Sequence, residues 1–303
     1  MSNKQLTKEQ VGLEKISPSA LDVYEGCPKL FYYQYWLGLA LEQDKRHMDF
    51  GSAIHHAIEV IYSQYDDHFG GGWEQADYRG IGWQTVEDAF LSHWRQHHVT
   101  DKSFAKFKET KAGQASPISS KEELYEHMKE DGLVMLKSYW KEKDRLLSEY
   151  EHDLSEFEIP LKVEMVNPTD AEDKLPVLLS MRIDARNRTR TRQVDFKTSG
   201  SSYNPDETRK KIQGQCYVFG TWMATGKPIG KFDYIILRKG LKSEDRIEVV
   251  QLEYDGADML AFFERVRSIL QKIANREFGR PSMGHNQWCD CYKYEEALLV
   301  EKK

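Results

Sequence analysis

The segment RIDARNRTRTRQVDFKTS, residues 182–199, contains two short stretches that mix apolar and polar residues, with the polar link NRTRT between them. We interpret the two stretches as strands and the link as a hairpin connection. Side chains at positions i and i+2 share one face of a strand, so Asp195 and Lys197 point in the same direction. The hairpin would bring Asp184 beside them, so that two carboxylates and one ammonium group converge.

Two carboxylates at close range repel each other, and a divalent cation bound between them removes the repulsion. Oxygen ligands of this kind suit Mg2+ or Mn2+. Lys197 would then orient or deprotonate a water, and the peptide carbonyl of Phe196 is a further candidate metal ligand. The reaction that this set favours is attack of a metal-activated water on a phosphodiester. Asp-x-Lys pairs also occur by chance on exposed strands, but the apolar neighbours Ile183 and Val194 favour a position near the core.

Further strands and helices are expected on both sides of this segment. The expected strands are FEIPLKVEMV, LPVLLSMRIDAR, RQVDFKTS, KFDYIILRK and RIEVVQLEY. Helices are expected over 205–225 and 255–277, and upstream over 20–39 with an interruption at Cys27-Pro28, from Gly51 to 65, over 86–98 and over 121–149. Ser17 or Ser19 would cap the first helix. We interpret 108–120 as a surface loop.

This order of elements predicts an α/β fold with a mixed central sheet, flanked by helices and preceded by a helical elaboration. The expected organisation is a flexible segment over 1–16, a helical region over 17–150, a core over 151–280 and a tail over 281–303.

The composition is that of a folded protein: 40% of the 303 residues are hydrophobic and 12% are aromatic. The first residues are polar and no apolar run is long enough to cross a bilayer, so we expect a cytoplasmic protein without a membrane partner. The formal net charge of −6 counts mildly against a nucleic-acid partner. A local basic groove is nevertheless compatible with an acidic chain.

Two helical motifs accompany the strand residues. Gly51 and His55 form a G-x-x-x-H pattern with Glu59 one turn later, and Gln213 and Tyr217 form a Q-x-x-x-Y pattern after the strands. Together with Asp184 and the Asp-x-Lys motif, this ordered set resembles the RecB-like exonucleases of the PD-(D/E)XK nuclease superfamily, which include the RecB and AddB nuclease domains and the CRISPR-associated adaptation exonucleases. The resemblance spans roughly residues 17–295 and implies a restriction-endonuclease-like core.

The resemblance implies a role for each motif residue. His55, Asp184 and Asp195 would bind the metal, together with the carbonyl of Phe196. For His55 the alternative is a surface histidine, since His56 is adjacent.

The remaining three motif residues would act around the metal. Lys197 would activate water, and Gln213 and Tyr217 would line the site and hold Lys197 or the DNA backbone. For Gln213 and Tyr217, a solvated helix residue and a core aromatic are nearly equal alternatives.

The cysteines depart from the family pattern. Many relatives hold an iron–sulfur cluster with one early cysteine and three near the C-terminus, whereas this sequence has Cys27, then only Cys289 and Cys291. His285 could substitute in a zinc or cluster site. Cys216 lies beside Tyr217 and is expected to be a core thiol. We therefore expect no complete four-cysteine iron–sulfur cluster.

The function expected from the resemblance is a metal-dependent DNA exonuclease that acts on DNA ends, prefers single strands and takes part in DNA repair or recombination. The alternatives are a structure-specific endonuclease of the same superfamily, a non-catalytic binding module, and a subunit that mainly docks on a helicase or integrase partner. The sequence contains no G-x-x-x-x-G-K-[ST] phosphate loop, so any unwinding would come from such a partner.

Overall fold

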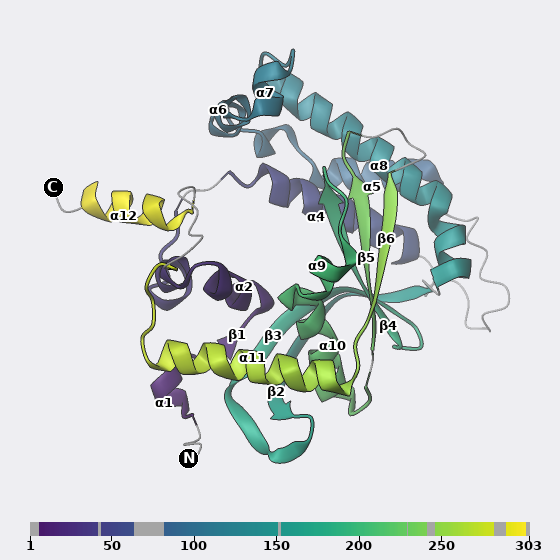
Figure 1. Ribbon diagram of the computed structural model, residues 1–303. Coiled ribbons are helices and arrows are strands. Elements are labelled where there is room, and N and C mark those ends of the chain that lie inside the picture. The colour runs from purple at the N-terminus through teal and green to yellow at the C-terminus, as the bar shows by residue number, and fades with distance from the viewer. Residues whose placement is uncertain are drawn as a thin grey trace.

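The computed structural model describes residues 6–41, 44–63, 82–150, 153–228, 230–240, 246–281 and 289–300. A mixed six-stranded sheet lies between two groups of helices (Figure 1). The strands are β1 (Lys15–Ile16), β2 (Leu154–Asn167), β3 (Asp170–Asn187), β4 (Arg192–Ser199), β5 (Lys231–Arg238) and β6 (Ile247–Glu253). The helices are α1 (Lys8–Val11), α2 (Pro18–Gly26), α3 (Pro28–Phe31), α4 (Arg46–Ser63), α5 (Trp83–His93), α6 (Asp101–Glu109), α7 (Lys111–Ala115), α8 (Lys121–Tyr150), α9 (Pro205–Arg209), α10 (Ile212–Thr225), α11 (Gly256–Ala274) and α12 (Cys291–Val300), with a π-helical turn at Tyr32–Trp36 and a 3-10 turn at Gln96–His98.

The strand order is β1-β3-β4-β5-β6, and β2 pairs with β3 outside this path. β3 and β4 are antiparallel, as the predicted hairpin requires. Asn187 closes the polar link between them, because its side-chain oxygen accepts hydrogen bonds from the backbone N–H groups of Thr191 and Arg192. β4 and β5 are parallel along the whole of β4. Parallel neighbours need a long crossover, and α9 and α10 supply it.

Side chains of β5 alternate between the two faces of the sheet and thereby define two cores. Phe232, Tyr234 and Ile236 join a first core with α2, α10 and α11. Ile235 and Leu237 join a second core with α4, α5 and α8. The sheet is therefore covered on both faces, which explains why β5 is apolar without interruption from Tyr234 to Leu237.

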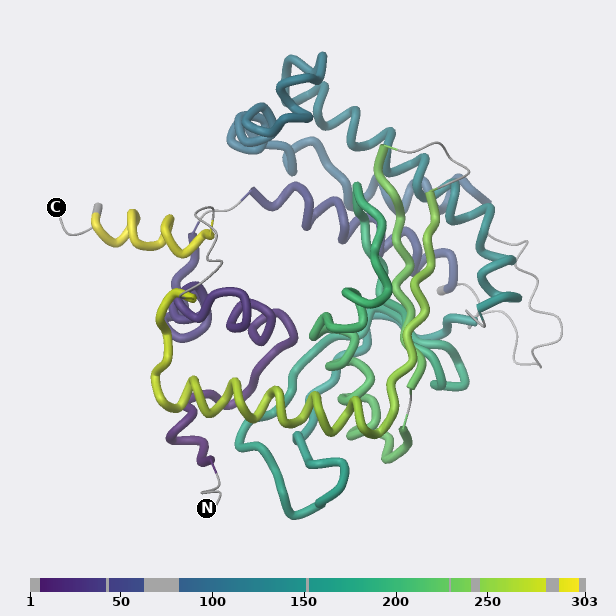
Figure 2. Tube along the Cα trace, viewed as in Figure 1, coloured from purple at the N-terminus to yellow at the C-terminus, as the bar shows by residue number. Residues whose placement is uncertain are grey.

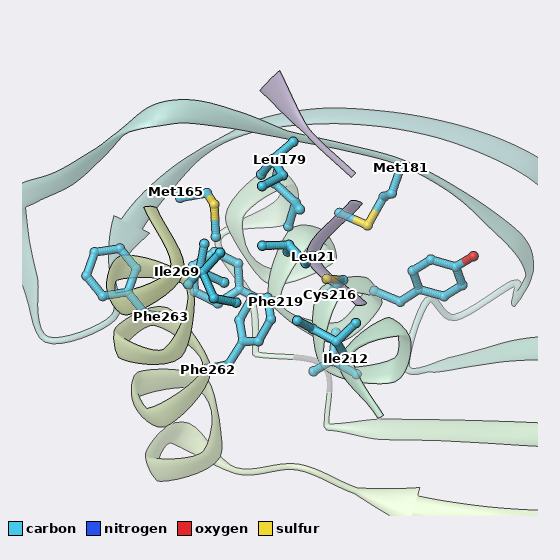
Figure 3. Packing of buried hydrophobic residues seen from close by; sticks show 14 of the residues in the cluster. Leu21, Met165, Leu179, Met181, Ile212, Cys216, Phe219, Phe262, Phe263 and Ile269 are labelled. Carbon is cyan, nitrogen blue, oxygen red and sulfur yellow. The ribbon is translucent and has the colours of Figure 1, made fainter. Parts of the chain in front are cut away.

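The first core is built from aliphatic and aromatic side chains of helices and strands far apart in the sequence (Figure 3). Leu21 of α2, Phe219 of α10 and Phe263 of α11 are all fully buried there. Cys216 lies among them with no exposed surface, and burial raises the pKa of its thiol. This confirms the expectation that Cys216 is a core thiol.

Several local expectations differ from the structure. The described part of the segment expected to be flexible, 6–16, contains α1 and β1; Thr7 forms a capping box and Ile16 pairs with β3. The segment 108–120, expected to be a loop, contains the end of α6 and all of α7. Thr110 explains this, because its side chain caps the start of α7.

The helical region expected over 17–150 also divides between the two faces of the sheet. α2 packs in the first core, and α4, α5 and α8 pack in the second. The helix expected over 205–225 is interrupted at Lys210 and Lys211, which separate α9 from α10. Within the described residues, no helix is both long and apolar enough to cross a bilayer.

A buried ion pair joins β4 to β5 three residues before Asp195. Arg192 Nη1 lies 2.7 Å from both carboxylate oxygens of Asp233, and the two side chains are 7% and 0% exposed. Breaking a buried pair leaves an uncompensated charge in the interior.

We expect Asp233→Ala to lower the free energy of unfolding by about 3–5 kcal/mol, because the Arg192 guanidinium would stay buried without its carboxylate. Glu164→Gln is the matched control, since Glu164 pairs with Lys174 on the surface and its loss should cost less than about 1 kcal/mol. Denaturant unfolding followed by circular dichroism measures both. Equal losses would mean that the buried pair contributes no more than a surface one.

Candidate active site

The site forms where β3 and β4 separate. The two strands pair only at Ala185–Val194 and Arg186–Gln193. Asp184 and Asp195 are the residues immediately beyond the Ala185–Val194 pair, one on each strand. Beyond these two pairs the strands separate, which leaves the backbone of Phe196 without a backbone partner on β3.

Side chains fill the hydrogen-bonding positions that β3 leaves open. The Phe196 N–H donates to Asp184 Oδ2 at 3.1 Å, and the Phe196 carbonyl accepts from His55 Nε2 at 2.9 Å. His55 belongs to α4, which packs in the second core, and its Nδ1 lies 3.5 Å from Asp184 Oδ2. His56, by contrast, lies against His93 of α5, with ring centroids 3.7 Å apart and the rings tilted by 32°. The structure therefore brings His55, and not His56, to Asp184 and Phe196.

Asp195 and Lys197 lie on the same side of β4, as the strand period predicted. Lys197 Nζ lies 2.6 Å from Asp195 Oδ2. Gln213 Nε2 donates to Asp195 Oδ1 at 2.7 Å and to the Tyr217 hydroxyl at 2.9 Å. Because positions i and i+4 of α10 are neighbours, Tyr217 holds the Gln213 amide in place. The structure thus brings His55, Asp184, Asp195, Lys197, Gln213 and Tyr217 together, whereas Glu59 lies beside His56.

The charges in this site are strongly coupled. Burial and the neighbouring Asp195 raise the pKa of Asp184 well above its usual range. Burial lowers the pKa of His55, so its ring is neutral and donates from Nε2 to the Phe196 carbonyl. Burial opposes the charge of Lys197, but Asp195 and Asp184 outweigh it and raise the pKa of the ammonium group.

Sequence reasoning missed one acidic residue, Glu158. It lies on β2 between the pairs Phe157–Ala185 and Ile159–Ile183, opposite Asp184. One carboxylate oxygen of Glu158 lies within 4.8 Å of a ring nitrogen of His55 and an oxygen of Asp184. Its φ angle is +48°, a strained conformation for a residue with a side chain. In the sequence, Glu158 was an ordinary member of a strand, and no motif identified it.

The donor set suits a hard divalent cation. The neutral His55 ring donates from Nε2, so the lone pair of Nδ1 faces Asp184, and a proton or a cation between them relieves the repulsion. Asp184, Glu158 and the second lone pair of the Phe196 carbonyl supply oxygen ligands of the kind that Mg2+ and Mn2+ prefer, while the oxygens of Asp195 contact Lys197 and Gln213. The residues present therefore fit such an ion.

A second group of possible metal ligands is formed by cysteines from the two ends of the chain. Cys27, Cys289 and Cys291 have sulfur atoms within 4.8 Å of one another. Figure 2 shows the N-terminal helices and α12 on the same side of the molecule, and a stacked pair, Tyr33 and Tyr294, joins them at 5.4 Å.

Two of these thiols, Cys27 and Cys291, are protonated when no metal is bound. Burial raises the pKa of Cys27, and it raises the pKa of Cys291 to about 12. His285 lies outside the described residues. Cys216 belongs to the first core and does not join the group.

We expect His55→Ala to weaken Mn2+ binding more than the roughly 10–100-fold typical of losing a residue that only orients a ligand. His56→Ala is the matched control and should bind Mn2+ as the wild type does, because His56 faces α5. Isothermal titration calorimetry measures both affinities. Equal weakening by the two substitutions would contradict the assignment of His55.

We expect no stoichiometric iron or sulfide in protein purified without oxygen, because the described residues bring three cysteines together and an iron–sulfur cluster is held by four ligands. Metal and sulfide analysis of wild type, Cys27→Ser and the control Cys216→Ser tests this. A brown protein with stoichiometric iron that Cys27→Ser abolishes would overturn the expectation.

Comparison with known proteins assigns this chain to a family. A family model described as PD-(D/E)XK nuclease superfamily matches residues 15–293. No curated protein matches the chain. Among solved structures, a protein of Eubacterium rectale named as a proposed exonuclease is similar, with 12% identity and a TM-score of 0.48 over 97% of this chain and 92% of that one. A phage-related exonuclease from Haemophilus somnus 129PT has 12% identity and a TM-score of 0.28 over 74% of this chain and 93% of that one.

The match of the family model covers most of the chain and includes every motif residue. It confirms the resemblance drawn from the order of the motifs, and the mixed sheet flanked by helices confirms the expected fold class. The chain belongs to the PD-(D/E)XK nuclease superfamily.

Proposed function

We propose that this nuclease is a divalent-metal-dependent deoxyribonuclease that removes nucleotides from DNA ends, with a preference for single strands. The observation that carries the proposal is the convergence of Asp184, Asp195 and Lys197 with His55 around the backbone of Phe196. A nuclease fold that had become a binding module alone would have no need of a buried aspartate paired with a lysine beside a second carboxylate.

The metal would be Mg2+ or Mn2+, held by His55, Asp184, Asp195 and the Phe196 carbonyl, with Glu158 as an additional acidic ligand. A divalent cation at such a site supplies Lewis-acid stabilisation of negative charge on a phosphodiester. It would also compensate the repulsion that raises the pKa of Asp184.

The protein side chains divide the remaining work. Lys197 is an ammonium group held against Asp195, so it would donate hydrogen bonds to a phosphate oxygen or an attacking water. Gln213 would orient Asp195, and Tyr217 would fix Gln213. These two residues act through Asp195 and are positioning residues.

Two alternative functions predict different experimental results for the same site. A structure-specific endonuclease of the superfamily would cut closed circles as readily as linear strands. A subunit that mainly binds a helicase or recombination partner would tolerate loss of Lys197. The proposed pathway, DNA repair or recombination, depends on which of these descriptions holds.

We expect Lys197→Ala to lower the cleavage rate about 100- to 1000-fold, the range for losing a group that stabilises charge in the transition state. The assay uses end-labelled single-stranded and double-stranded linear DNA and closed circles of each, with Mg2+, Mn2+ or EDTA. Lys162→Ala is the matched control, because Lys162 is an exposed lysine of β2.

Each outcome of this assay discriminates between the candidates. Metal-dependent release of nucleotides from linear single strands, with circles intact, supports the exonuclease. Cleavage of circles at the same rate favours the endonuclease, and full activity of Lys197→Ala would contradict the assigned site.

A further inference from the structure

A second lysine stands beside the proposed site and has no part in the metal centre. The Nζ atom of Lys211 lies 5.9 Å from the ring centroid of Tyr234, the β5 residue that pairs with Asp195, and its charge interacts unfavourably with Lys197 and favourably with Asp195. Its Nζ atom sits 3.6 Å from the centroid of the Tyr203 ring. Tyr203 in turn interacts with the charges of Lys197 and Asp195.

The interruption between α9 and α10 positions Lys211. Lys211 has extended backbone angles and is the N-cap residue of α10, two residues before Gln213. In the continuous helix that the sequence predicted, Lys211 would lie within the helix and would not be an N-cap residue. The break instead puts Lys211 at the end of α10 from which Gln213 reaches Asp195.

Lys211 carries a charge that its surroundings do not neutralise. Within the described residues no carboxylate forms an ion pair with Nζ, and Asp195, Asp22 and Glu207 act on it only at longer range. Partial burial and repulsion by Lys197 lower its pKa. A divalent cation in the centre would add to the positive potential, so an anion at this position would be stabilised.

Tyr203 provides a fixed platform for this ammonium group. The backbone N–H of Tyr203 donates to Glu248 Oε1 at 3.0 Å, and its ring packs on Tyr234 with centroids 5.8 Å apart. Burial raises the pKa of Tyr203, so its hydroxyl remains a hydrogen-bond donor at neutral pH. An ammonium over an aromatic face keeps its outward N–H groups for a ligand.

We propose that Lys211, held on the ring of Tyr203, binds a backbone phosphate of the nucleic acid next to the phosphodiester that lies at Lys197. The inference rests on the proposed nuclease function and extends it to a substrate-binding pair outside the metal centre. A phosphate diester is the anion of choice, because it is the group that the neighbouring centre must already hold, and successive phosphates of a strand repeat along its backbone.

The test measures binding separately from cleavage. Wild type, Lys211→Ala, Lys211→Arg and Lys210→Ala are titrated with fluorescein-labelled oligothymidylate in EDTA at several salt concentrations, followed by anisotropy. Lys211→Ala should bind on the order of 10-fold more weakly, and its plot of log affinity against log salt should be shallower by about 0.7, the contribution of one phosphate contact on a single strand. Lys211→Arg should restore both values.

Lys210→Ala removes the same charge from the adjacent residue and should leave the slope unchanged. In steady-state cleavage with Mn2+, Lys211→Ala should raise KM with kcat little changed, since the contact is made equally in the bound and reacting states. Thermal unfolding of Lys211→Ala should match wild type.

The failures are distinguishable. Unchanged affinity, salt slope and KM in Lys211→Ala, with an active wild type, would overturn the phosphate contact and leave the nuclease assignment standing. A wild type that binds the strand but never cleaves it would overturn the nuclease assignment. In that case, the phosphate contact would stand if the slope of log affinity against log salt still depended on Lys211. A wild type that does not bind the strand would overturn both.

Discussion

The separation of β3 from β4 after two paired residues is the constraint on which the site depends. A strand that loses its neighbour exposes N–H and C=O groups that must find other partners when they are buried. At Phe196 these partners are the Asp184 carboxylate and the His55 ring. Asp184 and His55, which satisfy this backbone, are also among the proposed metal ligands. The side chains that satisfy the backbone of Phe196 are thus part of the acidic centre.

Covering both faces of the sheet makes this arrangement rigid. α4 carries His55 and packs in the second core, whereas α10 carries Gln213 and packs in the first. The two helices therefore approach the end of β4 from opposite faces. The Arg192–Asp233 pair fixes β4 against β5 three residues before Asp195. The motif residues come from β3, β4, α4 and α10, so their mutual distances depend on how both cores pack.

The pKa values of the groups in the site depend on burial as much as on the residue types present. Two carboxylates and a third nearby acid share a volume with one ammonium and a neutral imidazole. Burial makes this excess of acid costly, which is reflected in the raised pKa of Asp184. Lys197 and Lys211 sit on the Asp195 side, and Glu158 sits on the Asp184 side. The centre therefore has an acidic half, suited to a cation, and a basic half, suited to a phosphate.

The sequence by itself determined the elements and the chemistry that is encoded in short spacing. The two-residue period of β4 put Asp195 and Lys197 on one face, the polar NRTRT link made the β3–β4 hairpin, and the four-residue period of α10 put Gln213 beside Tyr217. The order of these motifs also identified the superfamily. Its errors were local: α7, which depends on the Thr110 cap, and the break before Lys211.

Only the tertiary structure decided what depends on long-range packing. It brought His55, which the G-x-x-x-H pattern had already favoured, to Asp184, since which face of α4 meets the sheet is set by the second core. It brought Cys27 to Cys289 and Cys291 and kept Cys216 apart, because the chain ends meet on one side of the molecule. It also added Glu158 and Lys211, which belong to no motif of the sequence. Periodicity fixes the direction of a side chain within one element, whereas the distance between two elements is set by how the whole core packs.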